Sequence, residues 1–195
     1  FIGIAMLVPA MVDLAVGNRD WQVFLVSATV SIFIGGGLFL SNRSSGLSLE
    51  RRQAFLLTTA VWIVLPAAAA MPFTFSVMDI PYTDAFFEAM SGLTTTGSTV
   101  LTGLDTAPPG ILMWRALLQW TGGIGIIVTA IAIMPLLRIG GMQLFMMESS
   151  EFSTEKALPR VADIVKAIGY IYLVLSLVCT LALWMTGMSF FDAIT

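Results

Sequence analysis

Five hydroxyl residues surround a single glycine at positions 94–99, where the sequence reads Thr-Thr-Thr-Gly-Ser-Thr. Carbonyl and hydroxyl oxygens are the groups that replace the hydration shell of a cation inside a membrane pore. Gly97 would let the backbone adopt a positive φ that a side chain penalises. Taken alone, however, the run is a weak motif that favours a polar turn on the membrane surface. The surrounding sequence therefore has to decide between these two interpretations.

The charges around this run suit a cation. Residues 72–110 contain no Lys or Arg, and their four charged side chains are all carboxylates, at Asp79, Asp84, Glu88 and Asp105. Clustered charges of one sign raise the local concentration of the opposite ion. This segment therefore favours the approach of a cation.

The composition places the chain in a membrane. It is 57% hydrophobic and 11% charged, whereas soluble domains carry about 25% charged residues. A soluble helical protein would need many more surface charges, so we expect an all-α polytopic membrane protein. The apolar segments lie at about residues 1–16, 21–40, 53–71, 111–137 and 167–188.

Side chains for catalysis are scarce. The sequence has no histidine, and its one cysteine, Cys179, lies within an apolar run. Neither a metal cluster nor a nucleophile–base pair can be assembled from such residues. We expect no enzymatic activity, no bound cofactor and no nucleic-acid partner.

The basic residues indicate the orientation. Lys and Arg concentrate in residues 41–52 and 138–166, and they are absent from residues 72–110. Because basic loops stay in the cytoplasm, the hydroxyl run is predicted to enter the membrane from the outside.

A short helix is predicted just before the hydroxyl run, over residues 84–91. Thr83 would be its N-cap and Gly92 would occupy its C′ position. Such a helix is about 12 Å long, well under half of a hydrocarbon core of about 30 Å. A short helix that enters the membrane and returns as extended chain is typical of a re-entrant pore loop.

The following apolar segment contains three residues with specific expectations. Arg115 would either extend to the lipid headgroups or pair with Glu88 or Asp84 behind the hydroxyl run. Trp114 is expected to be an interfacial anchor. Gly122 is expected to allow two helices to approach closely.

The end of the sequence repeats the short helix. Residues 189–195, Ser-Phe-Phe-Asp-Ala-Ile-Thr, match residues 85–91, Ala-Phe-Phe-Glu-Ala-Met-Ser, with Asp192 in the position of Glu88. Both copies follow a long apolar segment, which indicates an internal repeat. One filter segment cannot surround an ion, so we expect the natural protein to be longer than this chain.

These features resemble the Trk/Ktr/HKT superfamily of potassium transporters, and specifically its TrkH-type potassium-translocating membrane subunits. The resemblance rests on the segments DAFFEAMSGLTTTGSTVLTGLD, LQWTGGIGIIVTAIAIMPLLRIGGMQLFMMES and ALWMTGMSFFDAI. It implies repeated M1–pore helix–M2 units, as in potassium channels, with an extra N-terminal helix pair. The implied domains are the helix pair and its cytoplasmic loop (1–50), the first repeat (51–138), a cytoplasmic connection (139–163) and the start of the second repeat (164–195).

The resemblance also implies a site. Gly97 would be the filter glycine of the first repeat, and Thr95 and Thr96 would bind K⁺, with Ser98 above them and Thr94 below. The implied activity is K⁺ uptake across the bacterial inner membrane through a channel-like pore, with coupling to Na⁺ or H⁺ left open. A homodimer and a nucleotide-binding TrkA-type subunit docking near residues 138–166 are the implied partners. The alternatives are a tetrameric cation channel with one pore loop per chain and a membrane scaffold that transports nothing.

Overall fold

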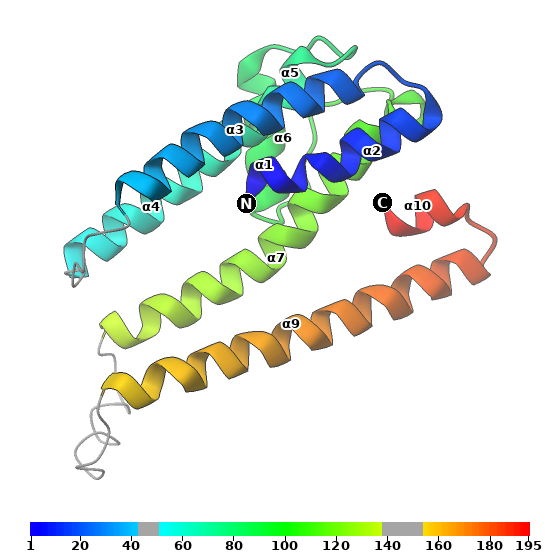
Figure 1. The fold of residues 1–195 in the computed structure, drawn as a ribbon. Coiled ribbons are helices and arrows are strands. Elements are labelled where there is room, and N and C mark those ends of the chain that lie inside the picture. Colours follow the sequence, from blue (N-terminus) through cyan, green and yellow to red (C-terminus); the bar gives the residue numbers. More distant parts are fainter. Residues whose placement is uncertain (43–50, 138–153) are drawn as a thin grey trace. The chain divides into compact units, whose positions relative to one another are not determined.

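The computed structural model describes residues 1–42, 51–137 and 154–195, and these ranges contain helices and no strand (Figure 1). The prediction of an all-α fold is confirmed. The helices are α1 (Ile2–Ala5), α2 (Leu7–Val16), α3 (Trp21–Ser41), α4 (Arg51–Ala69), α5 (Met71–Phe75), α6 (Tyr82–Leu93), the 3₁₀ helix η1 (Leu104–Thr106), α7 (Pro109–Leu137), α9 (Thr154–Met185) and α10 (Phe190–Ile194).

Four helical segments of the described ranges are long and apolar enough to cross a membrane. They are Trp21–Ser41, Arg52–Phe75, Pro109–Thr129 and Asp163–Met185. The remaining predicted span, residues 1–16, is shorter and is divided at Met6 into α1 and α2. Pro9 gives the reason, because it has no N–H to donate to the carbonyl of Ala5 and its ring crowds that carbonyl.

The described residues form two compact units, residues 1–123 and residues 124–194. In the second unit α10 follows α9, and the ring of Phe190 packs edge-on against Trp184 with 6.0 Å between centroids. The Ser189 hydroxyl donates to Asp192 Oδ2 at 2.7 Å and accepts from the Asp192 N–H at 3.1 Å. These reciprocal bonds cap α10, so a short helix forms at the second copy of the repeated sequence.

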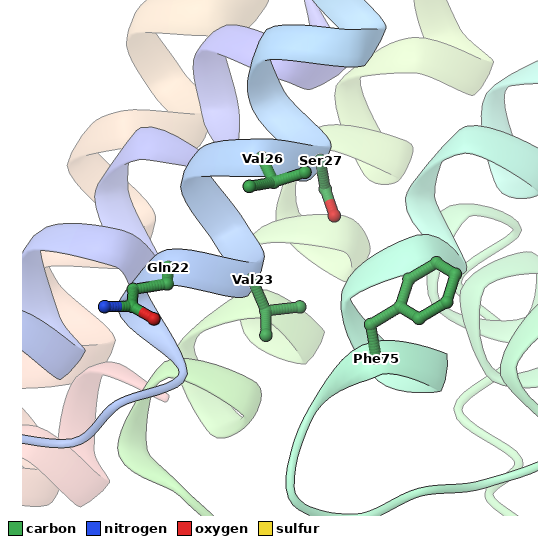
Figure 2. A pocket seen from close by; sticks show the side chains of 5 residues that line it. All are labelled: Gln22, Val23, Val26, Ser27 and Phe75. Carbon is green, nitrogen blue, oxygen red and sulfur yellow. The ribbon is translucent and has the colours of Figure 1, made fainter.

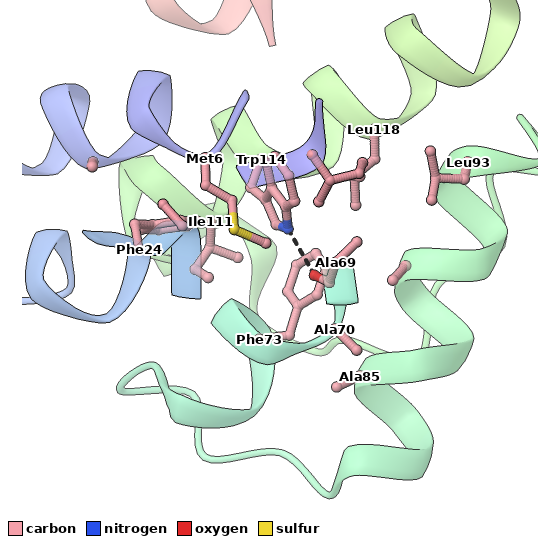
Figure 3. Packing of buried hydrophobic residues seen from close by; sticks show 14 of the residues in the cluster. Met6, Phe24, Ala69, Ala70, Phe73, Ala85, Leu93, Ile111, Trp114 and Leu118 are labelled. Atoms are coloured by element: carbon pink, nitrogen blue, oxygen red, sulfur yellow. Dashed lines mark hydrogen bonds between the residues drawn. The ribbon is translucent and has the colours of Figure 1, made fainter. Parts of the chain in front are cut away.

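In the first unit, α1 and α2 pack on α3, and α4 and α5 pack on α6. Its core is centred on Trp114, which packs edge-on against Phe24 (Figure 3). The Trp114 side chain is fully buried, and its Nε1–H donates to the Ala69 carbonyl at 2.9 Å. The expectation that Trp114 anchors at the membrane interface is therefore wrong.

The interruption between α4 and α5 explains this contact. Pro72 lies in the first turn of α5 and has no N–H for the helix hydrogen-bond pattern. Because α4 ends at Ala69, its last carbonyls can accept from other helices. Ala69 accepts from Trp114 of α7, and Ala67 accepts from the Tyr82 hydroxyl of α6 at 3.0 Å. The break between α4 and α5 thus allows α4 to bind α6 and α7, the helices before and after the hydroxyl run.

Candidate functional site

The helix that leads into the hydroxyl run is α6, with 12 residues and a length of about 18 Å. It is longer than predicted at both ends, and Thr83 lies inside it because the N-cap is Pro81. One face carries Ala85, Glu88, Ala89 and Gly92, all buried, whereas Phe87 is 45% exposed. The helix is still shorter than a membrane is thick, as a re-entrant helix requires.

The end of α6 is a Schellman turn. The Thr96 N–H donates to the Ser91 carbonyl and the Thr95 N–H donates to the Gly92 carbonyl, both at 2.9 Å. This pattern places Thr95 at the C′ position, and its φ is +55°. The prediction that Gly92 occupies C′ is therefore wrong. A β-branched residue with a positive φ is a genuine outlier, and such outliers gather at functional sites.

Gly92 instead serves a close approach between helices. A Cβ added there would lie 3.0 Å from Leu118 Cβ of α7, and a Cβ on Gly122 of α7 would lie 2.2 Å from the Leu93 carbonyl oxygen. The expected packing role of Gly122 is confirmed. Together the two glycines bring α7 against the last turn of α6, directly before the hydroxyl run.

The hydroxyl run itself is an open loop. The sign of φ changes at every residue: Thr94 has a φ of −84°, Thr95 and Gly97 are positive at +55° and +76°, and Thr96 and Ser98 are not positive. Residues 95–100 are exposed in the described structure. The predicted site residues therefore lie together in one segment with an unusual backbone.

Two hydrogen bonds hold this loop at its ends. The Ser91 hydroxyl donates to the Ser98 carbonyl at 2.6 Å, which ties the later part of the loop to α6. The Thr94 hydroxyl donates to the Met90 carbonyl at 2.8 Å and lies 2.8 Å from the Thr96 hydroxyl oxygen. Thr94 Oγ1 and the Ser98 carbonyl oxygen are thus engaged within the protein.

Glu88 is the main polar contact behind the loop. Its buried carboxylate accepts from the Thr99 hydroxyl at 2.9 and 3.1 Å and from the Val100 N–H at 3.2 Å. The Arg115 guanidinium of α7 pairs with the same carboxylate, with 2.6 Å between Nε and Oε1. Of the two interpretations of Arg115, the structure shows the ion pair, and the partner is Glu88 and not Asp84. The carboxylate therefore joins α6, the returning chain and α7.

Sequence reasoning missed two members of this arrangement, Ser91 and Thr99. Ser91 lies three residues after Glu88 on one face of α6, and that helical spacing could have indicated a shared role. Thr99 could not be found this way, because its partner depends on how the chain returns after Gly97.

The cavity between α3 and α5 is unsuited to a cation (Figure 2). Its volume is about 230 Å³, and its lining surface is mostly apolar, with few oxygens to replace the water around a cation. It is lined by Gln22, Val23, Val26, Ser27 and Phe75. The described residues also contain no group of three or more His, Cys, Asp or Glu side chains that could hold a metal ion. The hydroxyl loop remains the candidate site.

The model of the family described as "TrkH: Cation transport protein" matches residues 20–194. The chain belongs to the TrkH family. This confirms the predicted family. It also confirms that the chain belongs to a family of transport proteins and not of enzymes, and that it is part of a multi-pass protein of the bacterial inner membrane.

Individual relatives agree with this assignment. The TrkH-family chain is 44% identical over 191 residues to the Trk system potassium uptake protein TrkH of Escherichia coli K12, covering 97% of this chain and 40% of the relative. It is 35% identical over 193 residues to the Trk system potassium uptake protein TrkG of the same strain, covering 98% and 40%. The crystal structure of the potassium transporter TrkH from Vibrio parahaemolyticus matches with a TM-score of 0.84 and 41% identity, over 98% of this chain and 38% of that one. The chain thus spans about two fifths of the length of these relatives.

Proposed function

We propose that this chain is part of a K⁺ uptake protein of the bacterial inner membrane, and that residues 94–98 form one segment of its ion filter. The proposal takes K⁺ from the names of the relatives, which are potassium uptake proteins and a potassium transporter. It takes the filter from the loop that follows α6.

The observation that carries the filter is the alternating sign of φ over residues 94–98. In a β-strand φ keeps one sign, and successive carbonyl groups point to opposite sides. A change of sign at every residue allows successive carbonyl oxygens to face one side, where they can replace the water around a K⁺ ion. The C-terminus of α6 adds a partial negative charge at the same place.

Within this segment Thr95 and Thr96 are proposed to supply the main oxygens for K⁺. Gly97 supplies the backbone freedom, since its φ is +76° and a Cβ added there would meet no atom within 4 Å. Ser98 would contribute oxygens for K⁺ above Thr95 and Thr96, and Thr94 would contribute them below. These are the oxygens that do not take part in the hydrogen bonds to α6. Glu88 and Arg115 are proposed to hold the segment from behind.

The decisive experiment measures Rb⁺ or K⁺ uptake by the full-length protein in cells that lack their own K⁺ uptake systems. The test variant is Gly97→Ala and the matched control is Gly103→Ala. Gly103 is also exposed with a similar φ of +73°, and a Cβ there would meet nothing closer than 3.6 Å. Each alanine costs about 1–2 kcal/mol of backbone strain, so the two variants carry a similar strain at different places in the chain.

We expect Gly97→Ala to abolish uptake and Gly103→Ala to retain it at equal amounts in the membrane. Normal uptake with Gly97→Ala would reject the filter assignment and favour the membrane scaffold, for which this glycine is replaceable. The tetrameric channel with one pore loop per chain is disfavoured by the second short helix, α10, which follows a second span.

The proposal includes three further features that rest on the family resemblance. They are a homodimer, a TrkA-type regulatory subunit, and symport of K⁺ with Na⁺ or H⁺. The docking region suggested for that subunit, residues 138–166, lies outside the described residues as far as residue 153. Co-purification with the regulatory subunit and K⁺ uptake measured at two Na⁺ concentrations and two pH values test these features.

A further inference from the structure

Two buried carboxylates flank the turn between α2 and α3, Asp13 in the last turn of α2 and Asp20 directly before α3. The Asp13 side chain is fully buried and Asp20 is 3% exposed. Isolated carboxylates are costly to bury, so each needs a specific partner. The partner of Asp13 lies in α7, which follows the filter segment, and the partner of Asp20 lies between α5 and α6, before that segment.

Asp13 caps α7. Its Oδ1 accepts from the Gly110 N–H at 2.8 Å, in the first turn of that helix. Pro109 has no N–H, and the N–H groups of Ile111 and Leu112 both donate to the Pro108 carbonyl, at 2.9 and 3.2 Å. The Gly110 N–H is therefore the donor of this turn that needs an outside acceptor. The positive end of the helix also favours the negative charge of the carboxylate.

Position 110 requires glycine. A Cβ there would lie 2.2 Å from Asp13 Oδ2 and 2.5 Å from its carboxyl carbon. The carboxylate thus sits directly on the backbone of α7, and its Oδ2 has no hydrogen-bond partner among the described residues.

Asp20 binds the chain at the end of the α4–α5 span. It is the N-cap residue of α3, yet its side chain does not cap α3. Both carboxylate oxygens instead accept from the Val77 N–H at 3.3 Å, just after α5. Asn18 stabilises the turn, because its side chain donates to Asp13 Oδ1 at 3.5 Å and accepts from the Asp20 N–H at 3.3 Å.

We propose that the last turn of α2 and the turn that leads to α3 form a clip, which positions the two spans flanking the filter segment, with Asp13 and Asp20 as positioning residues for ion passage. Asp13 holds the outer end of α7, the helix that carries Arg115 and Gly122. Asp20 holds the outer end of the α4–α5 span. The N-terminal helix pair thereby holds the two spans of the first repeat in position. This inference rests on the proposed function.

The test is a double-mutant cycle in the full-length protein with Asp13→Ala, Gly110→Ala and the double variant. Gly36→Ala is the matched control, because a Cβ on that glycine of α3 meets nothing within 4 Å. The apparent KM for Rb⁺ and the maximal rate are measured per amount of protein in the membrane, and the thermal unfolding midpoint of each purified protein is recorded.

Asp13→Ala is expected to raise the apparent KM by up to about fivefold, since losing a helix cap shifts the equilibrium between the held and the released end of α7 by about that factor. Gly110→Ala is expected to have the larger effect by itself and none in the Asp13→Ala background, where the clash is gone. If Gly110→Ala does not accumulate in the membrane, the double variant should accumulate as Asp13→Ala does. Gly36→Ala should match the wild type.

The clip is overturned if Gly110→Ala is equally harmful with and without Asp13, or if KM is unchanged while only the amount of protein falls. A wild-type protein that takes up no Rb⁺ would reject the proposed function instead. In that case the thermal unfolding midpoints still test the clip. If the midpoint shifts of Asp13→Ala and Gly110→Ala add up in the double variant, the clip is contradicted.

Discussion

The contact between Glu88 and Arg115 leads to the sharpest prediction about stability. The Glu88 side chain is 2% exposed and Arg115 is 17% exposed, with 2.6 Å between Arg115 Nε and Glu88 Oε1. Glu88→Gln keeps an acceptor for the Thr99 hydroxyl and the Val100 N–H, but it removes the charge. The guanidinium of Arg115 then remains inside without a counter-ion.

The magnitude follows from the burial. Removing one partner of a fully buried ion pair lowers the free energy of unfolding by about 3–5 kcal/mol. The partial exposure of Arg115 makes this loss smaller. We expect a loss of about 2–3 kcal/mol, which corresponds to about a 30- to 150-fold change in the equilibrium between the held and the released hydroxyl run. Rb⁺ uptake should fall accordingly.

A second double-mutant cycle measures the coupling energy between Glu88 and Arg115. Glu88→Gln, Arg115→Gln and the double variant are compared by the thermal unfolding midpoint of the purified full-length protein and by uptake. The double variant should be less impaired than the sum of the single variants, by about 1–2 kcal/mol. Asp84→Asn is the matched control, because this carboxylate of α6 is exposed and pairs with no cation among the described residues; it should change stability by less than about 0.5 kcal/mol. Strictly additive effects would refute the role of the pair.

Two further substitutions test the packing around the site. Gly122→Ala should abolish uptake because its Cβ would lie 2.2 Å from the Leu93 carbonyl oxygen, whereas Gly125→Ala, with nothing within 4 Å, should be tolerated; equal effects would contradict the close approach. Trp114→Phe should keep the aromatic packing but leave the buried Ala69 carbonyl without its donor, at a cost of about 1–3 kcal/mol. Its thermal unfolding midpoint should fall, and an unchanged midpoint would show that this hydrogen bond adds nothing.

Much of the organisation could be read from the order of residue types. The four long spans and the short helix before the hydroxyl run follow from apolar runs of sufficient length and from one amphipathic stretch. The pairing of Arg115 with a carboxylate was one of two predictions, because a charge inside a membrane segment seeks either a partner or the headgroups.

The structure corrected the details that depend on contacts between distant segments. Trp114 is in the core and not at the interface, and because α4 ends at Ala69, the carbonyl of that residue can accept from the Trp114 side chain. The left-handed residue at the end of α6 is Thr95 and not Gly92, since Gly92 is needed for the approach to Leu118. Local preference for glycine at C′ was outweighed by packing between helices.

By itself the sequence determined the class of the protein, the positions of its spans and the place of the hydroxyl run, because these depend on composition and on short-range periodicity. Only the tertiary structure decided which groups hold that run in place. The bonds from Ser91, Thr99 and Arg115, and the attachment of Asp13 to Gly110, join residues as much as 97 positions apart. Such contacts form because buried polar groups must find partners wherever the packing of helices places them, and no local pattern encodes that.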